Sequence, residues 1–148
     1  MAADTPTVVM VCGLPASGKT TTADRLHGRI GGVLIRSCDV YQALGISLPD
    51  WVRRTRGFTV DVQAYDRVRD QAYSEMARRL DQVLVAGASL VIVDAVHGER
   101  AKRAVVYAIC RAHGTAPVLL LCRCDDPVEV GRRFRARNGR EYEPQHED

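Results

Sequence analysis

Four short apolar runs alternate with longer segments in which apolar residues recur every three or four positions. The runs lie at residues 7–12, 33–36, 90–94 and 117–122, and they consist mainly of Val, Leu, Ile and Met. Because their apolar residues are continuous rather than alternating with polar ones, we expect strands that are buried on both faces. Strands of this kind, separated by helices, are typical of a parallel sheet in an α/β fold.

The longer segments predict helices. Residues 61–86 place apolar side chains on one helical face, and Gly87 ends the segment. Residues 40–60 contain glycine and proline at irregular spacing, so we expect a loop-rich insertion that starts with a short helix. Further helices are expected at residues 18–30, 99–113 and 127–137.

A glycine-rich segment joins the first strand to the first helix. Residues 13–20 match G-x-x-x-x-G-K-S/T at every fixed position. Its backbone N–H groups can form a nest for an anion, and the following helix adds the positive end of its dipole. Lys19 can reach the outer phosphates of a nucleotide, and the Thr20 hydroxyl can bind Mg²⁺. A chance match would not require this strand and helix on either side, so we predict a triphosphate site.

Two aspartates follow predicted strands. Ligands of parallel sheets bind beyond the carboxyl ends of the strands, so Asp39, Asp94 and Arg123 should gather around residues 13–20. Asp94 ends an apolar run as in a Walker B strand and is a candidate Mg²⁺ ligand; the alternative is an ordinary turn. Asp39 is a candidate general base for an acceptor hydroxyl; the alternative is an N-cap for a helix starting near Val40.

Arginines are concentrated near residues 127–140. Arg133 and Arg137 are four residues apart and share a helical face, where they can act as a lid that stabilises charge on a transferring phosphoryl group. Arg132 and Arg135 project differently and are expected in solvent. A solvated face is the alternative for the whole cluster.

Two other arginine groups are open to two interpretations each. One lies beside Trp51 and Phe58 and either stacks and binds nucleic acid or forms a solvated face. The other follows the third strand and either contacts an acceptor or phosphate or is simply exposed. The first group is Arg53, Arg54 and Arg56; the second is Arg100 and Arg103.

Composition adds limits rather than a function. The net charge of +3 is too small to name a partner, and no apolar run is long enough to span a membrane. The N-terminus lacks the features of a signal peptide, so a cytoplasmic location is expected. Five cysteines are an odd number and are predicted to be reduced, with no second pair to make Cys122 and Cys124 a metal site.

Taken in order, these segments resemble the zeta-toxin and polynucleotide-kinase-like P-loop kinases, the AAA-33 type of ATP-binding proteins. The motifs are G-L-P-A-S-G-K-T-T, R-S-C-D, V-I-V-D-A, R-x-x-R, L-C-R-C and R-x-x-x-R. The resemblance covers nearly the whole chain. The resemblance implies one P-loop kinase domain over residues 1–148. It also implies an α/β fold, a three-layer αβα sandwich with a nucleotide-kinase-like parallel sheet of four or five strands.

The resemblance further implies binding of ATP and Mg²⁺. The implied catalytic residues are Lys19, Asp39, Arg133 and Arg137, and the implied metal ligands are Thr20 and Asp94. The implied nucleotide contacts are Gly13, Leu14, Pro15, Ala16, Ser17, Gly18, Lys19, Thr20 and Thr21.

The chain departs from the family pattern at two places. In polynucleotide kinases an arginine commonly follows the base aspartate closely, whereas Val40, Tyr41 and Gln42 follow Asp39 here, which weakens the assignment of a nucleic-acid 5′-hydroxyl kinase. Relatives usually continue into another strand and helix, but residues 141–148 are polar and cannot supply a core strand. We therefore expect a shortened sheet or one that relies on a partner.

These observations favour a kinase that transfers the γ-phosphate of ATP to a hydroxyl of a small molecule or a nucleic acid. One alternative is an ATPase or GTPase switch, although the chain lacks the N-K-x-D or T-K-x-D motif that reads guanine. Another is a nucleotide-binding regulatory or toxin-like module without turnover.

Overall fold

The computed structural model describes residues 4–46 and 62–138. Its sheet has four parallel strands in the order β2–β3–β1–β4. The strands are β1 (Thr7–Cys12), β2 (Val33–Arg36), β3 (Leu90–Asp94) and β4 (Val118–Leu121). Each of the four apolar runs has therefore formed the strand predicted for it, and the polar residues that follow the strands lie at one edge.

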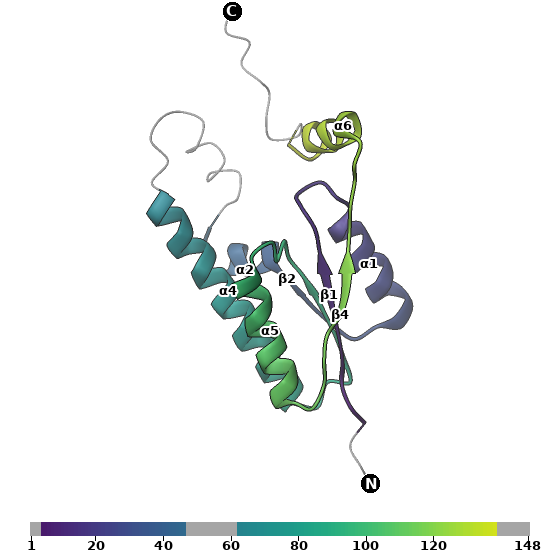
Figure 1. The fold of residues 1–148 in the computed structure, drawn as a ribbon, viewed down its shortest axis with the longest axis vertical. Coiled ribbons are helices and arrows are strands. Elements are labelled where there is room, and N and C mark those ends of the chain that lie inside the picture. Colours follow the sequence, from purple (N-terminus) through teal and green to yellow (C-terminus); the bar gives the residue numbers. More distant parts are fainter. Residues whose placement is uncertain (1–3, 47–61, 139–148) are drawn as a thin grey trace, which may run out of the picture.

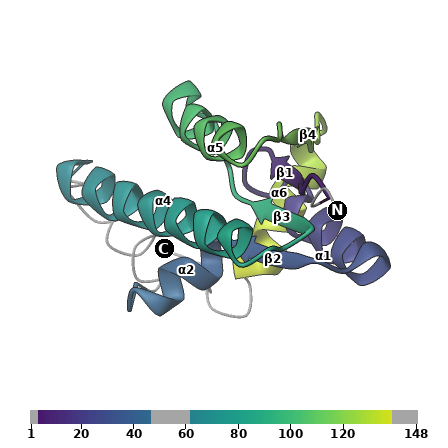
Figure 2. The same ribbon diagram turned by 90° about the horizontal axis from the view of Figure 1, so that it is seen from below.

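The helices make the other two layers. In both views α1 (Lys19–Ile30) lies on one side of the sheet, and α4 (Val62–Val85) and α5 (Arg100–Ala112) lie on the other (Figures 1 and 2). The short α2 (Ser37–Ala43) packs beside α4. The last helix, α6 (Pro127–Asn138), lies beyond the carboxyl ends of the strands rather than on a face of the sheet (Figure 1).

Two apolar clusters hold the layers together. Successive side chains of a strand point to opposite faces, so Val8 and Met10 of β1 face one cluster and Val9 and Val11 face the other. The larger cluster includes Leu80 of α4 together with residues of α2 and α5, and the smaller one lies under α1. Burying one such Val or Leu side chain contributes about 1.5–3 kcal/mol, so the central strands are firmly anchored.

The fourth strand differs from the expectation of burial on both faces. Val118, Leu119 and Leu121 are 52%, 45% and 64% exposed. In the described part of the chain β4 is an edge strand that pairs with β1 alone. The prediction was wrong for this strand because an apolar run does not reveal where a strand stands in the sheet. Among the described residues, no helix combines the length and apolar character needed to cross a membrane.

Candidate functional site

The phosphate loop, residues 13–18, leaves β1 between the ends of its two neighbouring strands. The Gly13 N–H donates to the Val96 carbonyl at 3.4 Å, which ties the loop to the segment after β3. A Cβ atom on Gly13 would lie 2.4 Å from the Cys122 carbonyl oxygen, and the backbone φ of Gly13 is +149°. Both the space and the backbone angle therefore require glycine at this position.

The loop ends at the start of α1 in a form suited to an anion. Gly18 is the N-cap, with a left-handed φ of 95°. No side chain caps this helix, and its first turn contains no acidic residue. The Ser17 hydroxyl is buried with no hydrogen-bond partner among the described residues. Uncapped N–H groups and an unpartnered hydroxyl fit a phosphate group.

Lys19 lies over the same loop. Its side chain is buried, and its Nζ donates to the Leu14 carbonyl at 3.3 Å. The Lys19 charge is also near enough to Asp94 to act on its pKa. The structure thus brings together the lysine of the glycine-rich motif and the aspartate that ends β3.

Asp94 is 2% exposed, and burial raises the pKa of its carboxyl group, while Lys19 and Arg36 act in the opposite direction. The Arg36 Nε donates to Asp94 Oδ2 at 3.2 Å, and the same guanidinium forms an ion pair with Asp24 of α1. Burial lowers the pKa of Arg36, but the two aspartates raise it above its ordinary value. Arg36 therefore holds Asp94 in place.

Sequence reasoning gave Arg36 no role. Its neighbour Asp94 is 58 residues away, and the two become partners because β2 pairs with β3 in a register that sets Arg36 opposite Asp94. An arginine that ends a strand was the only available signal, and it is a weak one without the strand order.

A magnesium ion would depend on few protein ligands here. Within the described ranges, no group of three or more His, Cys, Asp and Glu side chains could hold a metal. The Thr20 hydroxyl in the first turn of α1 and the Asp94 carboxylate are oxygen donors of the kind that Mg²⁺ prefers. These residues fit an ion whose remaining ligands are phosphate oxygens and water.

Asp39 follows β2 at the same edge of the sheet. It is exposed and is the third residue of α2, whose N-cap is Arg36. The alternative interpretation of Asp39 as an N-cap was therefore wrong, because the helix begins two residues earlier. The Asp39 carboxylate accepts a local hydrogen bond from the Cys38 thiol at 3.9 Å.

The last helix reaches the phosphate loop through Arg133. Its Nη1 donates to the Ala16 carbonyl at 3.2 Å, although 117 residues separate the two. A Cβ atom on Gly18 would lie 3.7 Å from the same nitrogen, so this guanidinium stands beside the loop between residues 16 and 18. Arg132 is largely exposed, as expected. Arg137 lies in α6, but its side chain is not among those that the structure describes.

A cavity of about 270 Å³ lies between α4, α5 and β3. His97, three residues after Asp94, lines this cavity together with Tyr73. The backbone N–H of His97 donates to the Tyr73 hydroxyl at 3.0 Å. Burial lowers the pKa of His97 to about 4, so its imidazole is neutral at pH 7. Lys102 lies over the Tyr73 ring and forms an ion pair with Asp70 across the two helices. Sequence reasoning missed this region, whose side chains meet only through packing.

The remaining arginines and cysteines have simpler positions. Arg103 donates to the carbonyls of His97 and Gly98 at 2.7 and 3.0 Å, which stabilises the segment after β3. Arg123 is exposed and forms an ion pair with Asp125. The five cysteines are free. The arginines of the predicted insertion, with Trp51 and Phe58, lie outside the described residues.

A family model described as an AAA domain, AAA_33, matches residues 8–148. The chain belongs to this AAA_33 family. No protein of curated function matches it at a significant level.

Solved structures similar to this AAA_33 chain include kinases. A protein from Chloroflexus aurantiacus assigned as a kinase is 19% identical with a TM-score of 0.67, over 93% of this chain and 69% of that one. A gluconokinase from Sinorhizobium meliloti is 16% identical with a TM-score of 0.63, over 95% and 70%. The Mycobacterium tuberculosis APS kinase in complex with AMPPNP and APS is 20% identical with a TM-score of 0.53, over 94% and 77%. At these identities the likeness confirms the P-loop kinase fold.

Proposed function

We propose that this AAA_33 protein is a phosphotransferase that moves the γ-phosphate of ATP to a hydroxyl group of a small molecule. The observation that carries the proposal is the hydrogen bond from Arg133 to the Ala16 carbonyl. It sets a guanidinium group beside the phosphate loop, which the buried Lys19 directly follows. An arginine in that position can stabilise the charge of a transferring phosphoryl group.

The residues have distinct roles in this proposal. The loop N–H groups and Lys19 bind the phosphates of ATP, and Thr20 and Asp94 hold Mg²⁺, which neutralises charge on the phosphate oxygens. Asp39 takes the proton of the acceptor hydroxyl. The hydroxyl oxygen forms a bond to the γ-phosphorus as the bond between that phosphorus and the ADP oxygen breaks. Arg133, with Arg137 on the same helical face, covers the transferring group.

Two observations support a small acceptor. Kinases of this fold include the gluconokinase and the APS kinase described above. His97 lines the cavity and directly follows Val96, whose carbonyl accepts a hydrogen bond from Gly13 of the phosphate loop. The cavity therefore adjoins the segment that contacts the loop. Nucleic acids remain an outcome of the screen below, because the predicted insertion that carries Arg53, Arg54 and Arg56 lies outside the described residues.

The test is a phosphate-acceptor screen with labelled ATP over sugars, nucleosides, aminoglycosides and oligonucleotides. We expect transfer to one small-molecule class. Asp39→Asn should bind ATP as the parent does but lose about 10²–10⁴-fold in transfer, since general base catalysis contributes that much. Lys19→Ala should weaken ATP binding at least about tenfold, since a charge-assisted contact to phosphate is lost.

Different outcomes would contradict different parts. Unchanged transfer by Asp39→Asn would remove Asp39 as the base. Unchanged ATP affinity in Lys19→Ala would contradict the phosphate site. ATP binding without transfer to any acceptor class would favour a regulatory module.

A further inference from the structure

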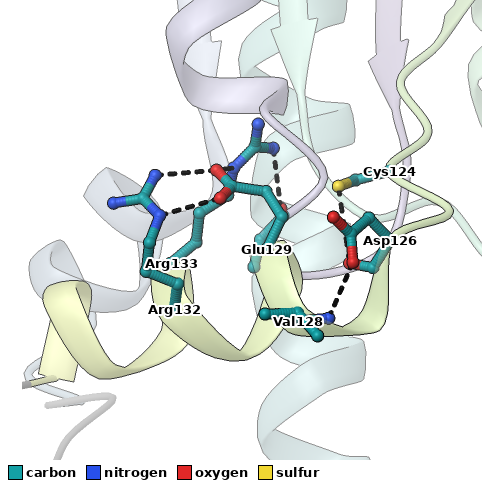
Figure 3. Close-up of polar contacts among 7 residues, drawn as sticks. Cys124, Asp126, Val128, Glu129, Arg132 and Arg133 are labelled. Atoms are coloured by element: carbon teal, nitrogen blue, oxygen red, sulfur yellow. Dashed lines mark hydrogen bonds and ion pairs between the residues drawn. The ribbon is translucent and has the colours of Figure 1, made fainter.

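The first turns of α6 contain a local cluster of charges, residues Glu129, Arg132 and Arg133, which we term the α6 triad (Figure 3). Glu129 receives two hydrogen bonds from Arg132, from Nε and Nη2, at 2.7 Å each. It also receives one from Arg133 Nε at 2.7 Å. The carboxylate therefore lies between two guanidinium groups, as i,i+3 and i,i+4 spacing on a helix allows.

Arg133 uses its two ends for different partners. Its Nε donates to Glu129 within the helix, and its Nη1 donates to the Ala16 carbonyl of the phosphate loop. Ala16 itself has a φ of +62°, an uncommon angle for a residue with a side chain. A single guanidinium thus connects a carboxylate of the lid to a carbonyl of the loop.

We propose that Glu129 is a positioning residue that holds the Arg133 guanidinium beside the phosphate loop, where it acts on the transferring phosphoryl group. The inference rests on the proposed phosphotransferase function. An arginine side chain has many rotamers, and fixing them costs free energy at each turnover. The bond to Glu129 fixes the side chain in advance, so the arginine is already oriented when the nucleotide arrives.

The charge balance of the α6 triad agrees with this role. One carboxylate and two guanidinium groups leave a net positive charge of one, so the triad attracts phosphate even though Glu129 is anionic. Removing Glu129 would raise the local positive charge while freeing the arginine. These two changes act in opposite directions on ground-state binding of a nucleotide, which should therefore change little. Binding of a transition-state mimic, which needs the oriented arginine, should weaken.

The chain contains a matched control in α4. Glu75 receives two hydrogen bonds from Arg78 at 2.7 Å and one from Arg79 Nε at 2.9 Å, the same pattern as in the α6 triad. We term Glu75, Arg78 and Arg79 the α4 triad. Changes to it reproduce the loss of a helical charge cluster without touching the phosphate loop.

The test compares Glu129→Ala, Glu75→Ala, Arg133→Gln and the double variant Glu129→Ala/Arg133→Gln in the full chain. The probes are ADP with Mg²⁺ alone, and ADP with Mg²⁺ and aluminium fluoride as a mimic of the transferring phosphoryl group, each titrated by calorimetry. We expect Glu129→Ala to lose about tenfold or more in affinity for the fluoride complex, since a small misplacement can cost up to about 100-fold. Its affinity for ADP alone should change less than about twofold, and Glu75→Ala should match the parent with both probes.

The double variant identifies the mechanism. If Glu129 acts through Arg133, its removal adds nothing to the loss already caused by Arg133→Gln. Parental affinity of Glu129→Ala for the fluoride complex, an equal loss in Glu75→Ala, or additive losses in the double variant would each overturn the proposal. A parent protein that binds neither probe would instead contradict the phosphotransferase function itself.

Discussion

The α4 and α6 triads have the same sequence pattern, E-x-x-R-R, and the same internal geometry. In each triad one carboxylate accepts from two arginines, and these arginines hold the pKa of Glu75 and of Glu129 at about 2. They differ in what the second arginine reaches. Arg133 donates to the phosphate loop, whereas Arg79 extends from a helix that lies on a face of the sheet.

The two triads share their local contacts and differ in a long-range one. Spacing along a helix suffices to form either triad, and exposed pairs of this kind add little to stability. The contacts of a triad with other elements depend on where its helix lies. The helix α6 lies beyond the carboxyl ends of the strands because it directly follows β4 and its short connection (Figure 1). A charge cluster therefore gains a candidate role from its place in the fold.

The largest expected difference between the triads concerns their second arginines. Arg133→Gln should lower transfer of phosphate from ATP about 100-fold, because loss of one donor to the transferring group costs about that much. Arg79→Gln should leave transfer unchanged, since its known partner is Glu75. Steady-state rates with the acceptor found by the screen would measure both. Equal effects of the two substitutions would remove the distinction between the helices.

Acid should weaken the packing of α4 before it affects either triad. Burial lowers the pKa of His97 to about 4, compared with about 6.5 in an unfolded chain, so between these pH values the unfolded state binds a proton that the folded state does not. The free energy of unfolding should fall by up to about 3 kcal/mol as pH decreases from 6.5 to 4, and this contribution is constant above pH 6.5.

Urea unfolding at pH 7 and pH 4.5 measures this loss, with His97→Gln as the control in which it should be smaller. Both glutamates keep their charge in that range, because their pKa values are about 2. A His97→Gln variant with the same pH dependence as the parent would show that other groups cause the loss.

The smallest expected effect concerns the residue before the two arginines, which is Gly131 in α6 and Ala77 in α4. A Cβ atom on Gly131 would meet the flexible end of Arg135 at 3.5 Å, an ordinary contact. Gly131→Ala should therefore stabilise α6 by about 0.5–1 kcal/mol through backbone entropy, and Ala77→Gly should destabilise α4. Hydrogen exchange of the amides in each helix measures both changes. Faster exchange in Gly131→Ala would contradict the prediction.

Much of the fold could be predicted because it depends on neighbours in sequence. Continuous apolar runs predicted the four strands, and helical spacing with glycine and proline boundaries predicted α1, α4, α5 and α6 within about two residues. The short α2 begins three residues before the expected start near Val40. The phosphate loop could be predicted equally well, since its glycines, Lys19 and Thr20 lie within eight consecutive positions. Both triads are also local, although their shared pattern does not indicate which one lies over the loop.

Tertiary packing determined the rest, and each case involves residues far apart in the chain. The order of the strands sets Arg36 opposite Asp94 and leaves the apolar side chains of β4 exposed at an edge. The meeting of α4, α5 and β3 buries His97 beside Tyr73. The path of the chain after β4 carries Arg133 to Ala16. Residue spacing decides contacts within an element, but contacts between elements depend on how apolar faces pack, which spacing alone does not specify.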